Sequence, residues 1–141
     1  MMNQVLTAIR SVEEYQYSVC KFITKNESTH TQSHQGGLCI SKNSYKLLFD
    51  EKGSKDDKKT RDASILWYDG IRSICKFYYY GSKNEYRITR LDRRFEIETF
   101  IIIVKISDDE YLGFILTKEI DVKKFLEHFK LFKNNLNKLI I

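Results

Sequence analysis

The pattern of apolar and polar positions predicts a chain built mostly of β-strands between two helices. Near the start, Leu6, Ile9 and Val12 recur at helical spacing behind Asn3, which predicts a short capped helix through about Tyr15. Alternating or continuously apolar runs then predict strands over residues 16–23, 38–40, 64–68, 71–80, 85–91, 97–106 and 111–117. Strands in succession, separated by turns rather than helices, favour an antiparallel barrel over a layered α/β fold.

The spacing of apolar residues changes near the end of the chain. Large apolar side chains recur there every three or four residues, at Phe125, Phe129, Phe132, Leu136 and Leu139. This spacing predicts an amphipathic helix that is capped by Asp121 and continues to the C-terminus. We expect the helix to pack on the barrel.

A charged stretch separates the predicted strands at 38–40 and 64–68. Residues 43–49 have mixed helical and extended character, and residues 50–61 contain few apolar side chains. The simplest interpretation of residues 50–61 is a solvated loop. The alternative is a flanking contact with DNA phosphates through its basic residues, Lys55, Lys58, Lys59 and Arg61.

Length and composition favour one compact domain, spanning residues 1–141, with a polyanionic partner. With 141 residues, of which 42% are hydrophobic, the chain can bury a single sizeable core. Lys and Arg outnumber Asp and Glu by 24 to 19, which gives a net charge of +5. Such a balance is common among soluble proteins, and it favours a polyanionic partner such as nucleic acid.

The sequence shows no sign of export or membrane insertion. No segment near the start has the pattern of a signal peptide, and the most apolar run, residues 100–104, is too short to span a bilayer. The three cysteines, Cys20, Cys39 and Cys75, lie in strand-like apolar patterns. An odd number in such positions predicts reduced, buried thiols in a cytoplasmic protein.

Residues 81–95 combine basic side chains with groups that can read bases. On a strand, Glu85, Arg87 and Thr89 share one face, and Tyr86 and Ile88 share the other. Arginine can bond O6 and N7 of guanine, asparagine can pair with adenine, and glutamate can accept from the amino group of cytosine. For such a strand alone, the simpler alternative is the solvated outer face of an ordinary hairpin.

A second polar segment lies upstream, over residues 24–42. Its first half has almost no apolar residue, although strand-like runs precede and follow it. A polar connection of about a dozen residues is longer than most, so it is either functional or disordered.

These two segments resemble the EcoRII-type N-terminal DNA-binding domain. In that family a strand leads into a polar loop and then into a His-Gln-x-Gly strand, and residues 26–31 and 34–42 match this pattern. The family then has a Trp-Tyr strand and a segment similar to NEYR-(I/L)-TRFGRF, which Trp67, Tyr68 and residues 84–95 match. The resemblance covers roughly residues 17–117. Ser41 replaces the usual proline, and Asp92 replaces a glycine that often adopts a positive φ.

The resemblance implies a mainly β (α+β) fold: an open seven-stranded antiparallel pseudobarrel, shared with plant B-three transcription factors and the recognition domain of BfiI. Two arms, residues 24–35 and 82–94, would enter the major groove from two sides. The expected base contacts are Gln32, His34, Gln35, Asn84, Glu85, Arg87, Thr89 and Arg90. The expected phosphate contacts are Lys25, Lys42, Lys83, Arg93 and Arg94.

The function implied is site-specific recognition of double-stranded DNA in a restriction-modification system, without a catalytic site, metal or cofactor in this domain. We expect the domain to be the N-terminal module of a longer protein. Its effector would be a nuclease domain or a GTP-driven motor, as in LlaJI-type relatives of McrB, in the same chain or in a partner subunit.

The sequence also offers residues for other functions. A Mg²⁺-dependent nuclease centre would use Asp50 with Lys52, or Asp121 with Lys123, but neither pair lies on a predicted strand. Zinc would use Cys20, His30, His34 and Cys39, whose spacing lacks a Cys-x-x-Cys knuckle. A cysteine nucleophile conflicts with the predicted burial of the thiols. A protein-interaction or autoinhibitory domain remains open.

Overall fold

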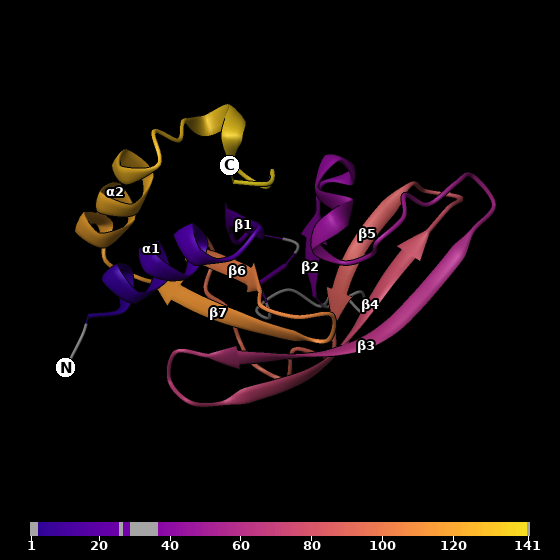
Figure 1. Cartoon of the computed structure of the whole chain (residues 1–141), viewed down its shortest axis with the longest axis horizontal. Coiled ribbons are helices and arrows are strands. Elements are labelled where there is room, and N and C mark those ends of the chain that lie inside the picture. Colours follow the sequence, from indigo (N-terminus) through magenta and orange to yellow (C-terminus); the bar gives the residue numbers. More distant parts are fainter. Residues whose placement is uncertain (1–2, 26, 29–36, 141) are drawn as a thin grey trace.

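The computed structural model describes residues 3–25, 27–28 and 37–140, which form a curled β-sheet with two helices at one end (Figure 1). In chain order the elements are α1 (Gln4–Glu14), β1 (Tyr17–Phe22), β2 (Leu38–Ile40), the 3-10 helix η1 (Lys42–Leu47), β3 (Lys58–Trp67), β4 (Arg72–Tyr80), β5 (Glu85–Thr89), β6 (Phe100–Lys105), β7 (Glu110–Leu116), α2 (Glu119–His128) and the 3-10 helix η2 (Lys133–Asn135).

The seven strands form one sheet in the order β1-β6-β7-β3-β4-β5-β2, so β1 and β2 are its two edges. The predicted open seven-stranded pseudobarrel is confirmed. It differs from the prediction in one pair, because β3 and β7 are parallel, with Ile65 opposite Tyr111. β7 lies between β3 and β6, and it is antiparallel to β6, its partner in the β6–β7 hairpin.

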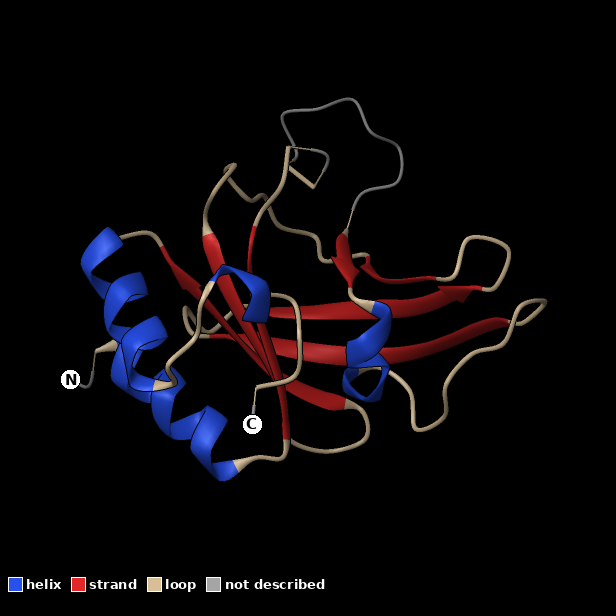
Figure 2. Cartoon of the chain, turned by 90° about the horizontal axis from the view of Figure 1, so that it is seen from above, coloured by secondary structure: helices blue, strands red, loops and turns tan. Residues whose placement is uncertain are grey.

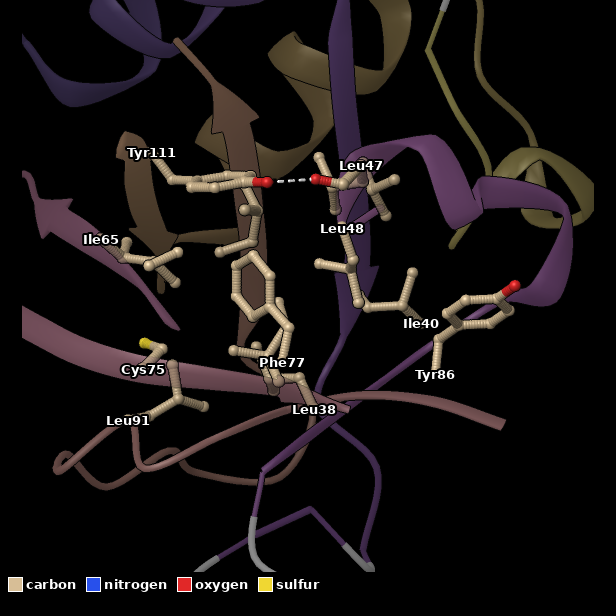
Figure 3. Close-up of a cluster of buried hydrophobic side chains, with 14 of the residues drawn as sticks. Leu38, Ile40, Leu47, Leu48, Ile65, Cys75, Phe77, Tyr86, Leu91 and Tyr111 are labelled. Atoms are coloured by element: carbon tan, nitrogen blue, oxygen red, sulfur yellow. Dashed lines mark hydrogen bonds between the residues drawn. The ribbon is translucent and has the colours of Figure 1, made fainter. Parts of the chain in front are cut away.

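The larger of two hydrophobic cores fills the inside of the curl. Its largest side chains are almost fully buried, at Trp67, Phe77, Tyr79, Tyr86 and Tyr111. Figure 3 shows how side chains from the strands and from η1 converge there, with the Tyr111 hydroxyl donating to the Leu47 carbonyl. η1 contacts both β1 and β5 and therefore covers the open side of the barrel.

The second core lies between the other face of β6 and β7 and the helices. Along β6, Ile101 and Ile103 face the first core, whereas Phe100, Ile102 and Val104 face the second. Burial on both faces explains why this strand is continuously apolar rather than alternating. Figure 2 shows α1 and α2 side by side at this end of the sheet.

The first helix follows the prediction. The side chain of Asn3 accepts a hydrogen bond from the backbone N–H of Leu6 at 3.1 Å, which caps α1. Of the three apolar residues at helical spacing, Ile9 and Val12 are buried against the sheet, whereas Leu6 is 40% exposed. The helix therefore buries one narrow face in the second core.

The predicted C-terminal amphipathic helix is confirmed as α2, but its cap and its extent to the C-terminus were wrong. α2 has Lys118 at its N-cap and ends at His128, and Lys130 then adopts a left-handed conformation with φ 54°. Phe132 is 73% exposed. Beyond η2 the chain turns and bonds to the free edge of β1, where Leu139 pairs with Val19. The apolar spacing of residues 129–139 would suit a helix. The chain instead satisfies the unpaired backbone groups of the edge strand β1.

β3 is longer than the sequence predicts and takes in the last four residues of the stretch 50–61, which was interpreted as a solvated loop. It begins at Lys58, opposite Tyr80 of β4, rather than at residue 64. Arg61 lies on the inner side, where Nε donates to the Leu48 carbonyl at 2.5 Å and Nη2 donates to the Tyr111 hydroxyl at 2.7 Å. The strand was missed because its register depends on pairing with β4, and its own residues show no apolar alternation.

Within the described ranges, no helix combines the length and the apolar character needed to cross a membrane.

Candidate nucleic-acid interface

β5 presents a polar face outward, as its alternating sequence predicts. Tyr86 and Ile88 are fully buried in the first core, whereas Glu85, Arg87 and Thr89 are half-buried on the opposite side of the strand. The apolar pair anchors the strand. The polar residues are therefore carried on a rigid element rather than on a loop.

Neighbouring strands extend this face into a patch. In register, Cys39 of β2 and Tyr78 of β4 flank Arg87, and directly opposite residues of antiparallel strands point to the same side. Lys76 lies opposite Thr89, and Tyr80 lies opposite Glu85. We call this set the outer patch: Cys39, Lys76, Tyr78, Tyr80, Glu85, Arg87 and Thr89.

Aromatic and charged groups in the outer patch are ordered by their contacts. The rings of Tyr78 and Tyr80 are stacked, with centroids 5.3 Å apart and planes 3° apart, and the Lys76 ammonium lies 6.0 Å from the Tyr78 ring. Nε of Arg87 lies 3.3 Å from Oε2 of Glu85. Such a patch offers a guanidinium, a carboxylate and flat aromatic surfaces to a ligand.

The two ends of β5 are shaped by residues in left-handed conformations. Asn84 closes the β4–β5 turn with φ 51°, and its Oδ1 accepts a hydrogen bond from the Tyr79 hydroxyl at 3.0 Å. That bond occupies one of the two lone pairs of Oδ1, and the other can still accept from adenine. After the strand, Arg90 and Asp92 have φ of 59° and 53°. Asp92 thus adopts the backbone conformation that glycine favours at this position of the related motif.

Leu91 and Phe95 fasten the segment that follows β5 to the core. The Leu91 carbonyl accepts from the Ser73 hydroxyl, which itself accepts from the indole N–H of Trp67 at 2.8 Å. The ring of Phe95 lies 5.6 Å from that of Trp67. Between these anchors, Arg90 and Arg94 are exposed.

Arg93 has structural partners of its own. Its Nη2 lies 2.8 Å from Oδ2 of Asp69, and its guanidinium lies 4.8 Å from the Trp67 ring. The hydrogen bond from Arg93 holds the pKa of the Asp69 carboxyl below its ordinary value, helped by the Ile71 backbone N–H. This arginine therefore links the β3–β4 turn to the segment after β5.

Comparison with known proteins identifies the fold. No protein-family model and no curated protein matches the chain. The chain is similar to the crystal structure of the B3 domain of the UbaLAI restriction endonuclease with cognate DNA, at a TM-score of 0.54 and 17% identity, over 92% of this chain and 91% of that one. The chain has the fold of a B3 domain. The N-terminal domain of Helicobacter pylori LlaJI.R1 is also similar, at a TM-score of 0.46 and 13% identity, over 72% of this chain and 88% of that one.

On this B3 fold the predicted second arm, residues 82–94, comprises the β4–β5 turn, β5 and the segment after it. Of the predicted first arm, residues 24, 25, 27 and 28 are described, and Gln32, His34 and Gln35 lie outside the described residues. Four of the five basic residues predicted to contact phosphates are exposed: Lys25, Lys42, Lys83 and Arg94.

Some residues that organise this end of the B3 fold escaped the sequence analysis. Lys21 and Glu27 form a buried ion pair beside Cys39, and Asn137 joins them from the C-terminal segment. In the sequence, nothing distinguishes Glu27 from the other polar residues of the segment 24–42. No periodicity marks Asn137, because its partners are far away in the sequence.

The three cysteine thiols of the chain differ in their burial. Cys20 and Cys75 are buried, and desolvation raises the pKa of each to about 12. Cys39 is half-buried in the outer patch. Among the described residues, no group of three or more His, Cys, Asp or Glu side chains is placed to hold a metal ion; His30 and His34 of the zinc hypothesis lie outside them.

Proposed function

We propose that this chain is a site-specific double-stranded DNA-binding domain of a restriction-modification system, which recognises DNA and carries no catalytic site of its own. The observation that supports it most is the outer patch, where Arg87 lies between Cys39 and Tyr78 with its Nε against Glu85. The fold adds support, because the similar UbaLAI B3 domain was crystallised with cognate DNA.

Base reading would come from two arms in the major groove. A guanidinium whose plane is fixed by Glu85 can present its terminal nitrogens to O6 and N7 of a guanine, and Glu85 can accept from a neighbouring cytosine amino group. The base contacts we propose from the second arm are Asn84, Glu85, Arg87, Thr89 and Arg90. Those we propose from the first arm are Gln32, His34 and Gln35.

Phosphate contacts would set the register of the domain on the duplex. We propose that these come from Lys25, Lys42, Lys83, Arg93 and Arg94, which flank the proposed base contacts along the chain. Each neutralised phosphate releases condensed counterions, so the affinity would fall steeply with salt concentration. The net charge of +5 favours this mode of binding.

The domain would direct an effector to its target. The sequence resemblance favours a nuclease or a GTP-driven motor, in the same chain or in a partner subunit. Separating recognition from catalysis in this way leaves the domain with no need for a metal or a cofactor.

The test is selection from a pool of random-sequence duplexes at about physiological salt, followed by sequencing of the retained DNA. We expect enrichment of one motif whose length matches the contacts of two arms. Retention without enrichment would leave a backbone-binding domain only.

Two further outcomes would replace the proposal. No retention at any salt concentration would favour a protein-interaction or autoinhibitory domain. Mg²⁺-dependent cleavage of the selected duplex, abolished by Asp50→Asn or Asp121→Asn, would establish a nuclease.

A further inference from the structure

The two edges of the open sheet, β1 and β2, are joined by side chains rather than by a strand ladder. Lys21 on β1 is only 6% exposed and forms an ion pair with Glu27, which is 7% exposed. The Lys21 ammonium also donates to the Cys39 carbonyl of β2 at 2.9 Å. One buried cation therefore bridges the gap between the two edges of the barrel.

The Glu27 carboxylate holds both ends of the connection between these strands. Its Oε1 accepts from the backbone N–H of Thr24 at 2.9 Å, just after β1. Its Oε2 accepts from the backbone N–H of Cys39 at 2.7 Å, within β2. The first residue of the predicted first arm, Thr24, and Cys39, which follows the arm, are thus bonded to a single side chain.

Asn137 makes a second bridge, from the C-terminal segment. Its backbone N–H donates to the Cys20 carbonyl of β1 at 2.7 Å, and its Nδ2 donates to the Cys39 carbonyl of β2 at 3.1 Å. Its Oδ1 accepts from the Ser41 backbone N–H at 3.1 Å. A φ of 58°, which asparagine tolerates better than most residues, permits this set of bonds.

These bridges converge on the strand that pairs with the outer patch. The Cys39 carbonyl accepts from Lys21 and Asn137, and its backbone N–H donates to Glu27. In register, Cys39 lies opposite Arg87 of β5. β2 is short, with three residues, so its own ladder to β5 gives limited support. The position of β2 therefore depends on the bridges.

We infer that Lys21, Glu27 and Asn137 are positioning residues for DNA readout: they fix β2, and with it the Cys39 side of the outer patch, relative to Arg87, so that the patch meets a duplex without rearrangement. This inference rests on the proposed function. Preorganisation of this kind raises affinity for the correct ligand by removing the cost of ordering the site on binding.

The physics of buried ion pairs favours positioning over simple stabilisation. Desolvating two charges costs about as much as their attraction returns, so such a pair is weak support for a fold. A carboxylate with three donors in defined directions does, however, determine the geometry of the backbone around it. The pair is thus better explained by the geometry that it imposes.

Asn137→Gly tests this with little risk to the fold. Glycine accepts the left-handed backbone and keeps the bond to Cys20, so only the side-chain bonds to Cys39 and Ser41 are lost. Lys130→Gly is the matched control, since Lys130 has φ 54° and an exposed side chain away from the bridges. Lys21→Met combined with Glu27→Gln removes the ion pair without leaving one buried charge alone.

Affinity would be measured by fluorescence anisotropy on the selected duplex and on a scrambled one, with thermal unfolding in parallel. We expect Asn137→Gly to weaken binding to the selected duplex about tenfold, the equivalent of one or two lost hydrogen bonds, and to leave the scrambled duplex nearly unchanged. Lys130→Gly should change neither. A loss confined to stability would move the melting temperature but not the ratio of the two affinities.

The outcomes separate this inference from the proposed function. If the wild type prefers one DNA sequence and both the Asn137→Gly and the Lys21→Met/Glu27→Gln variants keep that preference unchanged, the inference alone is overturned. Wild-type binding without any sequence preference overturns the proposed function, and the inference with it.

Discussion

Arg87 and Glu85 form an ion pair along one face of β5, with Nε of the arginine 3.3 Å from Oε2 of the glutamate. The two side chains are 22% and 34% exposed, so water screens the pair. Ion pairs in such surroundings contribute only about 0–1 kcal/mol to stability. The consequence of this pair is orientation: it holds a planar donor in a fixed position on a rigid strand.

Arg87→Ala should therefore affect DNA reading far more than folding. If Arg87 bonds a guanine, its loss costs about 1–3 kcal/mol of binding and relaxes specificity at one base pair. Fluorescence anisotropy on the selected duplex and on singly mismatched duplexes measures both effects. Arg72→Ala is the matched control, because Arg72 is an exposed arginine of β4 bonded to Ser64 at 3.0 Å, outside the outer patch. An unchanged specificity ratio in Arg87→Ala would exclude its assignment as a base contact.

Arg93 and Arg94 are adjacent candidates for phosphate contact with different structural roles. Arg93→Ala removes the ion pair to Asp69 and the contact with Trp67, so we expect a loss of about 1–2 kcal/mol of stability. Arg94→Ala should change stability by less than about 0.5 kcal/mol, because its side chain is exposed.

Each of these two variants should also lower the salt dependence of DNA binding by about one phosphate contact. Thermal unfolding and affinity measured across a salt series separate the two effects. Equal melting temperatures for the two variants would contradict the structural role of Arg93.

Gly37 should be intolerant of a side chain for a reason that Gly70 does not share. Both glycines have positive φ, 123° and 88°, so alanine is strained at either position. A Cβ at Gly37 would lie 2.2 Å from the Ile88 carbonyl oxygen, whereas nothing lies within 4 Å of one at Gly70. Gly37→Ala must push β2 away from β5, while Gly70→Ala introduces backbone strain alone.

We expect Gly70→Ala to cost about 1 kcal/mol of unfolding free energy and Gly37→Ala about 1–3 kcal/mol more. Urea unfolding measures the difference. Because β2 lies beside Arg87, sequence-specific DNA binding should be lost only in Gly37→Ala. Equal losses in both variants would show that the close approach to Ile88 is not maintained in solution.

Stability should decrease at alkaline pH because of the buried thiols. Burial raises the pKa of Cys20 and Cys75 from 9.0 to about 12, so the folded chain retains protons that the unfolded chain releases. The associated stability is complete below about pH 8.5 and is lost as the pH rises toward 12, by up to about 1.4 kcal/mol per pH unit and thiol.

Urea unfolding between pH 7 and 9 measures this slope below the range in which tyrosines titrate, since burial also raises the pKa of Tyr86 and Tyr111 above the ordinary value of 10.0. Cys75→Ala should lower the slope by about half, since one of the two buried thiols is then absent. A free energy of unfolding that does not vary with pH in this range would contradict the burial of both cysteines.

The local pattern of apolar and polar residues was sufficient to predict an element wherever the burial of one strand or helix face decides the structure. The alternation of Glu85, Arg87 and Thr89 with Tyr86 and Ile88 placed the outer patch, because a half-buried strand has a period of two. The side-chain acceptor of Asn3 marked the start of α1. The two polar motifs, taken together, indicated the pseudobarrel before any strand order was known.

Tertiary contacts decided those features of the fold that no local sequence pattern indicates. β6 is apolar throughout because it separates two cores, and α2 ends early because the chain after it bonds to the edge of β1. Asn137 and Cys39 are 98 positions apart, yet they meet where the barrel closes. The sequence by itself determined the strands and the polar face that we propose reads DNA; only the closing of the sheet determined how that face is held, because the free energy of that closure lies in contacts between residues distant in the chain.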